Sequence, residues 1–425
     1  MKRVTIVGGG ASGVFCACLL KSGAPDLYEV QIVEQGNQLL RKVRASGNGR
    51  CNFTNEHLST SHYLSKEGEE AFVREALRAL PSSKVRSIFQ SLGLLSVSLE
   101  SGMVYPRTLR SESLVRCLTA WLDRLRIPVI YGKEVVQVER KGETFLLSLA
   151  STDADVPLSP DKEKVGTDLL ILATGGAYGI GKDERSCGYS LVRPLGHRLT
   201  PIHAGICALT VEEKSLTKAC QGWKVQAGLE DSQGNEVQGD LLFTDYGLSG
   251  IGIFRLSNLL LDRIQKSHRP QALTVNLFPE YGSEEFMAWL RQLSQDQAGT
   301  PMKDIFAAFL PPALLSNIGA SLGRDLGEPL GNLGEEDLET LLFTLQRMSF
   351  TVTGSRRRDH GQVTCGGIAT EGISPKTMES LWVPGLYFLG EIMDIQGECG
   401  GYNLHWAWAS AYLCAEHLLH AGNQS

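Results

Sequence analysis

The stretch VTIVGGGASG, residues Val4–Gly13, decides the fold of this chain. Its β-branched start, Val4 to Val7, predicts a buried parallel strand. The glycines that follow fit G-x-G-x-x-G, and Val14 to Leu20 continues as an apolar helix. A second strand over residues 29–33 leads to Glu34, 21 residues after the last glycine of the motif. A strand, a glycine turn, a helix, a strand and an acid in this order predict a βαβ unit that binds a dinucleotide.

Each part of this motif has a physical role in holding a dinucleotide. Gly8 permits the tight turn, Gly10 lets the backbone approach the pyrophosphate, and Gly13 lets the helix pack close to the strand. The helix N-terminus offers N–H groups and a partial positive charge to the phosphates. Glu34 accepts the ribose hydroxyls and disfavours a 2′-phosphate, so FAD and NAD remain open at this site. The first predicted cofactor-binding residues are Gly8, Gly10, Ala11, Ser12, Gly13, Glu34 and Gln35.

The segment from Arg41 to Asn55 favours FAD over NAD. It is too rich in Gly, Asn and Ser to be core, and its composition suits wrapping a large polar ligand, although an ordinary surface loop is the alternative. NAD enzymes usually continue from the ribose acid into another βα unit. The predicted cofactor contacts here are Lys42, Ser46, Gly47, Asn48, Arg50, Cys51 and Asn52, with Val135 further along the chain.

Two later motifs point to the same cofactor. A buried strand ends in Ala-Thr-Gly-Gly at Gly176, and a strand near the C-terminus ends in Gly390-Glu391. Gly400-Gly401 then open a helix from about His405 to Leu419, whose N-terminus is expected to stabilise negative charge on a reduced flavin. No second G-x-G-x-x-G follows a strand, so a nicotinamide donor would visit only transiently. The predicted contacts are Thr174, Gly175, Gly176, Gly390, Glu391, Asp394, Gly400, Gly401, Tyr402, Asn403 and Leu404.

Composition narrows the class of protein. The 425 residues suit two or three domains, and the formal net charge of −6 argues against a general nucleic-acid coat. There is no C-x-x-C pair, no signal peptide and no apolar run long enough for a membrane span, so we expect a cytoplasmic protein with reduced thiols. The nine His residues form no metal-binding pattern, so we expect no metal.

The chain resembles the BaiN / aminoacetone-oxidase-type family of bacterial FAD-dependent flavoproteins, within the two-dinucleotide-binding-domain superfamily. The resemblance rests on GGGASG (Gly8–Gly13), KVRASGNGRCNFTN (Lys42–Asn55), GMVYPRT (Gly102–Thr108), LATGG (Leu172–Gly176), GLSG (Gly247–Gly250), PKTMES (Pro375–Ser380) and GEIMDIQGECGGYNLHWAWAS (Gly390–Ser410). These pieces span almost the whole chain in order, and SGNGRCN and GGYNL are the most specific.

The resemblance implies an α/β fold with a Rossmann-like FAD-binding domain built from both chain ends, residues 1–190 and 357–425. It implies an inserted β-rich substrate domain, residues 191–280, and a small helical flap with a return strand, residues 281–356. This chain has Asp245 where the family pattern has His, and Ile251 where it has Pro. Both departures lie in the insert, so they leave the substrate open.

The sequence therefore predicts an FAD-dependent oxidoreductase acting on a small or medium organic substrate, as a monomer or homodimer. The preferred reaction is transfer of hydride from NAD(P)H to an activated carbon–carbon double bond; the alternative is an amine oxidase using oxygen. A flavin-dependent RNA-modifying protein and a non-catalytic flavin module are further alternatives, and no nucleic-acid partner is expected. Tyr105 and Arg107 are candidate substrate-binding residues, and the catalytic residues remain unknown.

Overall fold

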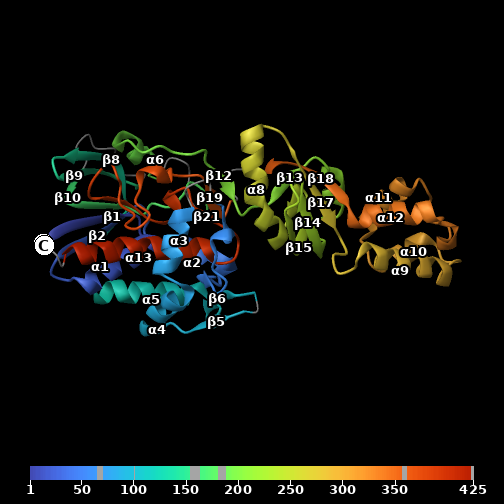
Figure 1. Ribbon diagram of the computed structural model, residues 1–425, viewed down its shortest axis with the longest axis horizontal. Helices are drawn as coiled ribbons and strands as arrows, with labels where there is room; N and C mark the ends of the chain where they lie inside the picture. The colour runs from blue at the N-terminus through green and yellow to red at the C-terminus, as the bar shows by residue number, and fades with distance from the viewer. Residues whose placement is uncertain (65–69, 100, 154–162, 180–187, 357–360, 423–425) are drawn as a thin grey trace. The chain divides into compact units, whose positions relative to one another are not determined.

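The chain folds into two compact units in the computed structural model, which describes all residues except 65–69, 100, 154–162, 180–187, 357–360 and 423–425 (Figure 1). Unit 1 comprises Met1–His203 and Gln362–Ser425, and unit 2 comprises Ala204–Gly361. The chain leaves unit 1, builds unit 2 and returns. The return at residue 357 that the sequence predicts lies outside the described residues.

A parallel sheet forms the centre of unit 1. In the described residues its strand order is β20-β11-β1-β2-β7, and each neighbouring pair is parallel. The consecutive residues Val4, Thr5 and Ile6 of β1 are fully buried, as expected for a strand covered on both faces. Strand β20 comes from the C-terminal segment, so this segment completes the sheet. The strands are β1 (Lys2–Val7), β2 (Tyr28–Glu34), β7 (Val129–Tyr131), β11 (Leu169–Leu172) and β20 (Leu386–Phe388).

Helices from both ends of the chain cover this sheet. In Figure 1, α1 (Ala11–Gly23) and α13 (Tyr402–Gly422) lie side by side, with α5 (Ser111–Arg124) beyond them. The ring of Phe15 is 5.4 Å from that of Trp408 and 6.1 Å from that of Trp121 between centroids, so aromatic packing joins these three helices. An antiparallel sheet, β8 (Lys133–Lys141), β9 (Thr144–Ser151) and β10 (Glu163–Thr167), also contacts the parallel sheet.

Shorter elements complete unit 1. The small antiparallel sheet β3-β6-β5 ties the polar segment after Arg41 to the strand that carries Tyr105. The helices are α2 (Arg41–Ala45), α3 (Glu70–Ala79), α4 (Ser82–Ser91) and α6 (Tyr189–Val192), and the strands are β3 (Thr54–Asn55), β4 (Tyr63–Leu64), β5 (Ser96–Ser98), β6 (Met103–Pro106), β12 (His203–Gly205, whose last two residues belong to unit 2), β19 (Val363–Cys365) and β21 (Gln396–Gly397).

Unit 2 is built on a closed antiparallel barrel in the order β13-β16-β15-β14-β17-β18. The barrel closes because β13 pairs with both β16 and β18. Its strands are β13 (Leu209–Val211), β14 (Lys224–Asp231), β15 (Glu236–Thr244), β16 (Gly247–Ser249), β17 (Gln271–Asn276) and β18 (Met348–Ser355). Helices α7 (Lys214–Ala219) and α8 (Ile251–Ser267) pack on the barrel. The β-rich insert that the resemblance implies is confirmed.

A group of helices lies between β17 and β18 in the sequence. They are α9 (Ser283–Asp296), α10 (Met302–Phe306), α11 (Pro312–Leu322) and α12 (Glu335–Gln346), and Figure 1 shows them gathered at one end of the barrel. Their buried apolar residues, including Phe286, Phe306, Ile318 and Leu341, form a small core of their own. These helices fall within residues 281–356, where the resemblance implies a helical flap and a return strand. No described helix of the chain is long and apolar enough to cross a membrane.

A buried ion pair fastens the barrel to α8. The side chain of Asp231 is fully buried, and one of its carboxylate oxygens lies 2.8 Å from Nη1 of Arg263. The backbone N–H of Gln233 and the Asn235 side chain also donate to this carboxylate. Burial by itself raises the pKa of the Asp231 carboxyl. The hydrogen bonds and Arg263 together lower this pKa by more than burial raises it, so the net pKa lies below its usual value.

Replacing Asp231 with Ala should destabilise unit 2 by about 3–5 kcal/mol, because a nearly buried guanidinium loses its partner. Hydrogen exchange of the barrel amides measures this opening free energy. The matched control is Asp262→Ala on α8, the helix of Arg263. This change removes an exposed ion pair with Lys266 and should alter the opening free energy by less than about 0.5 kcal/mol. Because the folded pKa of Asp231 is depressed, its contribution is present above the unfolded pKa of about 4. The difference in opening free energy between wild type and Asp231→Ala should therefore shrink as the pH falls through the folded pKa of Asp231. Equal exchange rates in wild type and Asp231→Ala at neutral pH would contradict this role.

Candidate functional site

The carboxyl ends of the parallel strands bring the predicted motifs to one edge of the sheet. Strand β1 leads into Gly8, β2 ends at Glu34, β11 leads into Ala173–Gly176 and β20 leads into Gly390. The chain passes from β1 to β2 on one side, and β11 lies on the other side of β1. This reversal of direction is a topological switch point, the place where open α/β sheets bind their ligands.

The glycine loop has the geometry that a dinucleotide requires. A Cβ on Gly8 would lie 2.4 Å from the carbonyl oxygen of Ala173, and one on Gly13 would lie 2.0 Å from the carbonyl oxygen of Gly8, so the loop itself excludes side chains at both positions. A Cβ on Gly10 would meet nothing within 4 Å. Gly10 is also the N-cap of α1, which has no side-chain cap and no acid in its first turn. The open space at Gly10 and the uncapped helix N-terminus therefore fit a pyrophosphate.

Glu34 is held in place by backbone amides beside this loop. Its two carboxylate oxygens accept from the N–H groups of Gly9 and Gly36, both at 2.7 Å. A carboxylate oxygen has two acceptor positions, so Glu34 keeps capacity for the ribose hydroxyls. The carbonyl of the next residue, Gln35, accepts from Thr152 at 2.9 Å, and Val135 is buried on β8.

A salt bridge joins three of the predicted motifs. The Lys42 ammonium lies 2.6 Å from Oε2 of Glu391 and donates to the carbonyl of Tyr178. Glu391 also accepts from the N–H of Thr364 at 2.8 Å and, at 3.4 Å, from that of Gly176. The sequence predicts the three residues separately but not this network, and it missed Thr364. The one available signal was that Thr364 stands shortly before a Gly-Gly pair.

The segment around Cys51 follows an unusual backbone path. Gly47 and Asn48 have φ values of 56° and 54°, and Cys51 has a φ of 59° with a fully buried side chain. Burial raises the pKa of the Cys51 thiol to about 12, so this thiol is not a nucleophile at neutral pH. The Oδ1 atom of Asn52 is buried and has no hydrogen-bond partner among the described residues.

That unsatisfied acceptor lies beside the start of α13. A Cβ on Gly401 would be 2.7 Å from Oδ1 of Asn52, and Gly401 has a φ of 95°. A buried acceptor without a partner costs free energy, and a ligand donor placed there relieves the cost. This orphaned atom, together with the open space at Gly10, is the observation that fits bound FAD.

The C-terminal residues of the predicted site are largely engaged within the protein. Gly390 donates to Ser410 at 3.0 Å and accepts from the Trp406 indole at 3.1 Å. Asp394 is buried and accepts from Gln396, and the side chain of Asn403 bonds the backbone of Gly397 through both of its ends. Their positions suit contacts to FAD mainly through backbone groups. Every predicted cofactor-binding residue lies in unit 1.

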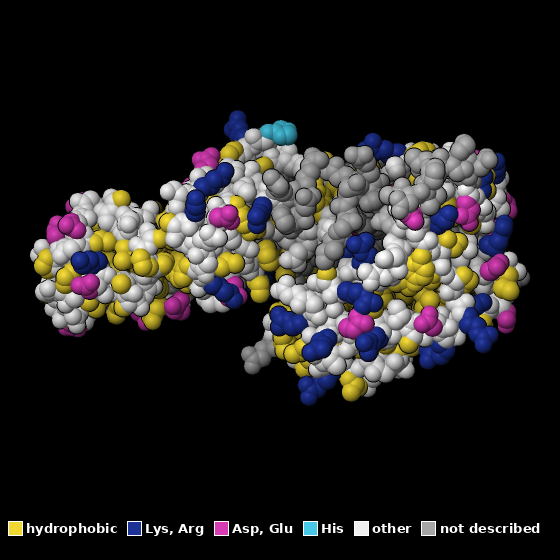
Figure 2. All heavy atoms as spheres, turned by 180° about the vertical axis from the view of Figure 1, so that it is seen from behind, with side chains coloured by type: hydrophobic (Ala, Val, Ile, Leu, Met, Phe, Trp, Pro, Cys, Tyr) yellow, Lys and Arg dark blue, Asp and Glu magenta, His cyan; other side chains and the backbone are white. Residues whose placement is uncertain are grey.

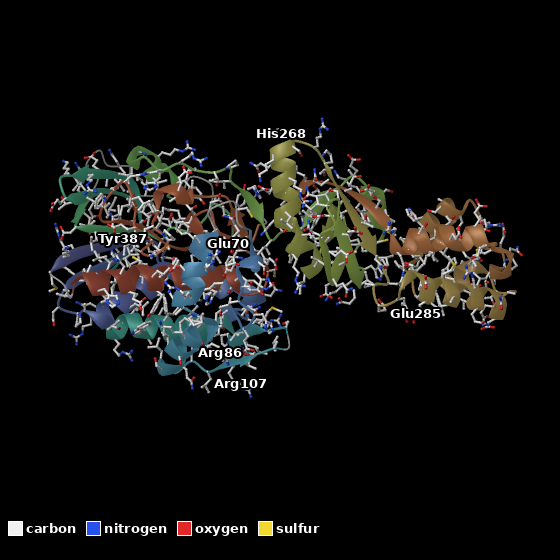
Figure 3. All side chains as sticks on the ribbon, in the orientation of Figure 1. Glu70, Arg86, Arg107, His268, Glu285 and Tyr387 are labelled. Atoms are coloured by element: carbon white, nitrogen blue, oxygen red, sulfur yellow. The ribbon has the colours of Figure 1, made fainter. Side chains whose placement is uncertain are left out.

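The two candidate substrate-binding residues face different surroundings. Tyr105 is buried on β6, and the guanidinium of Arg50 lies 5.5 Å from the centre of its ring. Arg107 is exposed, and Figure 3 shows it at the outer edge of unit 1, near Arg86. The structure therefore does not bring Tyr105 and Arg107 into one buried site.

Comparison with known proteins identifies the family. Residues 2–417 match the model described as HI0933-like protein Rossmann domain, so the chain belongs to this family. It is 30% identical over 423 residues to 3-dehydro-bile acid delta(4,6)-reductase of Clostridium scindens, and the alignment covers 97% of this chain and 98% of that relative. It is 31% identical over 417 residues to ribosomal RNA dihydrouridine synthase of Haemophilus influenzae, which covers 96% of each.

A solved structure supports the fold. The 3-ketosteroid-delta4-(5alpha)-dehydrogenase of Rhodococcus jostii RHA1 superposes with a TM-score of 0.51 at 12% identity, over 100% of this chain and 97% of that chain. The resemblance and the fold class predicted from the sequence are confirmed. The chain is an FAD-dependent oxidoreductase. The contacts of individual residues to FAD remain predictions.

Replacing Gly10 with Ala should weaken FAD binding at least tenfold, about 1.4 kcal/mol, and leave the fold intact. The added methyl group meets no protein atom within 4 Å but enters the space assigned to the pyrophosphate. FAD titration followed by flavin fluorescence measures the affinity. Gly282→Ala is the matched control, since Gly282 is likewise an N-cap, that of α9, with nothing within 4 Å of an added Cβ. If both variants bind FAD as wild type does, the pyrophosphate does not lie at Gly10.

Proposed function

We propose that this FAD-dependent oxidoreductase is a reductase that takes hydride from NAD(P)H and passes it to a carbon–carbon double bond conjugated to a carbonyl. One observation carries the proposal: two relatives that match almost the full chain, a delta(4,6)-reductase of 3-dehydro-bile acids and a dihydrouridine synthase, have names that describe this type of reaction. In both, a double bond next to a carbonyl becomes saturated. The carbon skeletons of a bile acid and a uridine differ, so what the two substrates share is the double bond conjugated to a carbonyl.

The described residues supply binding and electrostatics for this reaction. When bound, FAD supplies the two-electron relay between the nicotinamide and the acceptor. The glycine loop and the N-terminus of α1 hold the pyrophosphate, and Glu34 holds the ribose. Helix α13 has 21 residues and no acid in its first turn, so its N-terminus is a positive end suited to a negatively charged reduced ring.

The test separates the two half-reactions. The purified protein is mixed without oxygen with NADH and with NADPH, and the visible flavin bands are followed. Fast bleaching with either nucleotide supports the reductase, and reoxidation by a 3-oxo-4-ene steroid or by a uridine-containing RNA then identifies the acceptor class. Bleaching by small amines alone would favour an amine oxidase using oxygen. Flavin that neither nicotinamides nor amines reduce would leave a non-catalytic flavin module.

Two substrate classes fit this reaction: small enones such as steroids, and uridine in RNA. A group of exposed arginines favours testing RNA. We call Arg41, Arg50, Arg107 and Arg110 the arginine surface: all four are exposed, and none has a carboxylate partner among the described residues. Figure 2 shows Lys and Arg side chains spread over one face of unit 1, with Asp and Glu side chains between them. The net charge of −6 that argues against nucleic acid is an average over the chain. Exposed arginines without a carboxylate partner are side chains suited to neutralising phosphates, and these four support phosphate binding on that ground.

Several contacts hold the arginine surface together. Ser111, the first residue of α5, donates to the carbonyl of Arg44 at 2.6 Å, which joins the end of α2 to the start of α5. Arg110 is the N-cap of α5, and Arg107 follows the strand that carries Tyr105. Because Arg50 lies over the ring of Tyr105, the surface adjoins a segment predicted to bind FAD. A uridine base could enter there while its backbone phosphates stay outside.

The double variant Arg107→Glu/Arg110→Glu should weaken RNA binding and reduce the slope of log affinity against log salt by about one for each phosphate that the protein no longer neutralises. Its reduction of the steroid should not change. The matched control is Arg74→Glu/Arg78→Glu on α3, with the same charge change at exposed arginines that are paired with Glu70 and Glu75. Equal RNA affinity and equal salt slope in wild type and the Arg107/Arg110 variant would remove RNA as a substrate class.

A further inference from the structure

The proposed reduction needs a proton as well as a hydride. Addition of hydride to one carbon of a conjugated double bond pushes the electron pair onto the carbonyl oxygen, and the adjacent carbon must then be protonated. A side chain that donates this proton contributes typically 10²- to 10⁴-fold to the rate. The acid has to lie beside the flavin, keep its proton at neutral pH and be free of a strong acceptor inside the protein.

Tyr105 on β6 meets these requirements. Its side chain is 5% exposed, and among the described residues its hydroxyl has one hydrogen-bond acceptor, the sulfur of Met103 at 3.5 Å. A thioether is a weak acceptor, so the hydroxyl remains available to a stronger one. Burial raises the pKa of Tyr105, which keeps it protonated at neutral pH.

The Tyr105 ring lies beside a segment predicted to bind the flavin. A Cβ on Gly47 would be 3.7 Å from the edge of this ring, which places the ring against the polar segment after Arg41. Asn55 of that segment pairs with Met103 on β6, the strand of Tyr105. The side chain of Asn55 also donates to the carbonyl of Gly400 at 2.9 Å, just before α13. The strand of Tyr105 is therefore linked to the polar segment and, through Asn55, to the start of α13.

Neighbouring acids in these segments have strong acceptors of their own. The hydroxyl of Tyr63 donates to the carbonyl of Tyr402 at 3.0 Å. His62 lies 3.3 Å from a carboxylate oxygen of Glu398 and stacks on the ring of Tyr402. The Cys51 thiol is fully buried. By contrast, the proton of Tyr105 has only the weak acceptor of the Met103 sulfur among the described residues.

We infer that Tyr105 is a catalytic acid that protonates the substrate carbon next to the carbonyl, and this inference rests on the proposed reductase function. The O–H bond of Tyr105 breaks as the new C–H bond forms, while the hydride from the reduced flavin forms the other C–H bond. The hydride brings its own electron pair, and the π pair of the double bond, held meanwhile on the carbonyl oxygen, forms the bond to the proton. The phenolate is stabilised by the Arg50 guanidinium, 5.5 Å from the ring centre, and water returns the proton.

The test is Tyr105→Phe with each half-reaction measured alone. The flavin is first reduced with dithionite, so the test does not depend on the nicotinamide donor, and is then reoxidised by the 3-oxo-4-ene steroid or the uridine-containing RNA. We expect this reoxidation to slow by about 10²-fold or more, with a loss of the solvent deuterium isotope effect and of the alkaline limb of the pH profile. Reduction by NAD(P)H and reoxidation by ferricyanide, which needs no proton on carbon, should stay as in wild type.

Tyr28→Phe is the matched control, because Tyr28 is equally buried and its hydroxyl donates to the carbonyl of Leu418, in contacts outside the predicted flavin segments. It should reoxidise at the wild-type rate. If Tyr105→Phe does so too, with the isotope effect intact, Tyr105 is not the acid. If reduced wild type reacts with neither acceptor, the proposed reductase function falls, and the role of Tyr105 falls with it.

Discussion

The close approach of Gly8 to the end of β11 is the contact on which the nucleotide site depends. A side chain at Gly8 would overlap the carbonyl of Ala173, and one at Gly13 would overlap Gly8 itself. Because the loop turns so tightly, α1 begins within four residues of β1 and its N-terminus faces the carboxyl edge of the sheet. The space left at Gly10 follows from this packing. The predicted phosphate site is thus a consequence of how two neighbouring strands and one helix meet.

The same edge depends on the C-terminal segment. Strand β20 pairs with β11, and α13 packs along α1, so residues from both ends of the chain share one core. The Trp406 indole donates to the carbonyl of Gly390, and the Ser410 hydroxyl accepts from the N–H of Gly390. The first βαβ unit therefore cannot bury its helix until the last helix is in place. Contacts of such long sequence separation carry a large loop-closure cost, which makes unit 1 a high-contact-order fold.

The sequence predicts the parts of the fold that are encoded locally. The β1–α1–β2 unit was predictable because a β-branched strand, a glycine turn and an apolar helix follow one another between Lys2 and Glu34. The pairing of Lys42 with Glu391 was not, because 349 positions separate them and neither segment signals the other. The closed barrel was not predictable in detail, since β13 and β16 are each three residues long and show too little alternation. The weakly bonded hydroxyl of Tyr105 follows from tertiary packing alone.

The net charge of the whole chain does not describe the charge at a single surface. The sum of −6 suggests a protein that avoids phosphates, yet α2, the loop after it and the residues before α5 carry several arginines. Glu112, in the first turn of α5, is occupied by Arg44 and Arg116. Interactions between exposed charges fade beyond the Debye length of about 8 Å at physiological salt, so acids farther away than this do not cancel the charge of these arginines. A small enone and a uridine in RNA would present the same conjugated unit to the flavin. They would differ only in what stays outside the site, and only the RNA carries the phosphates that a positive surface attracts.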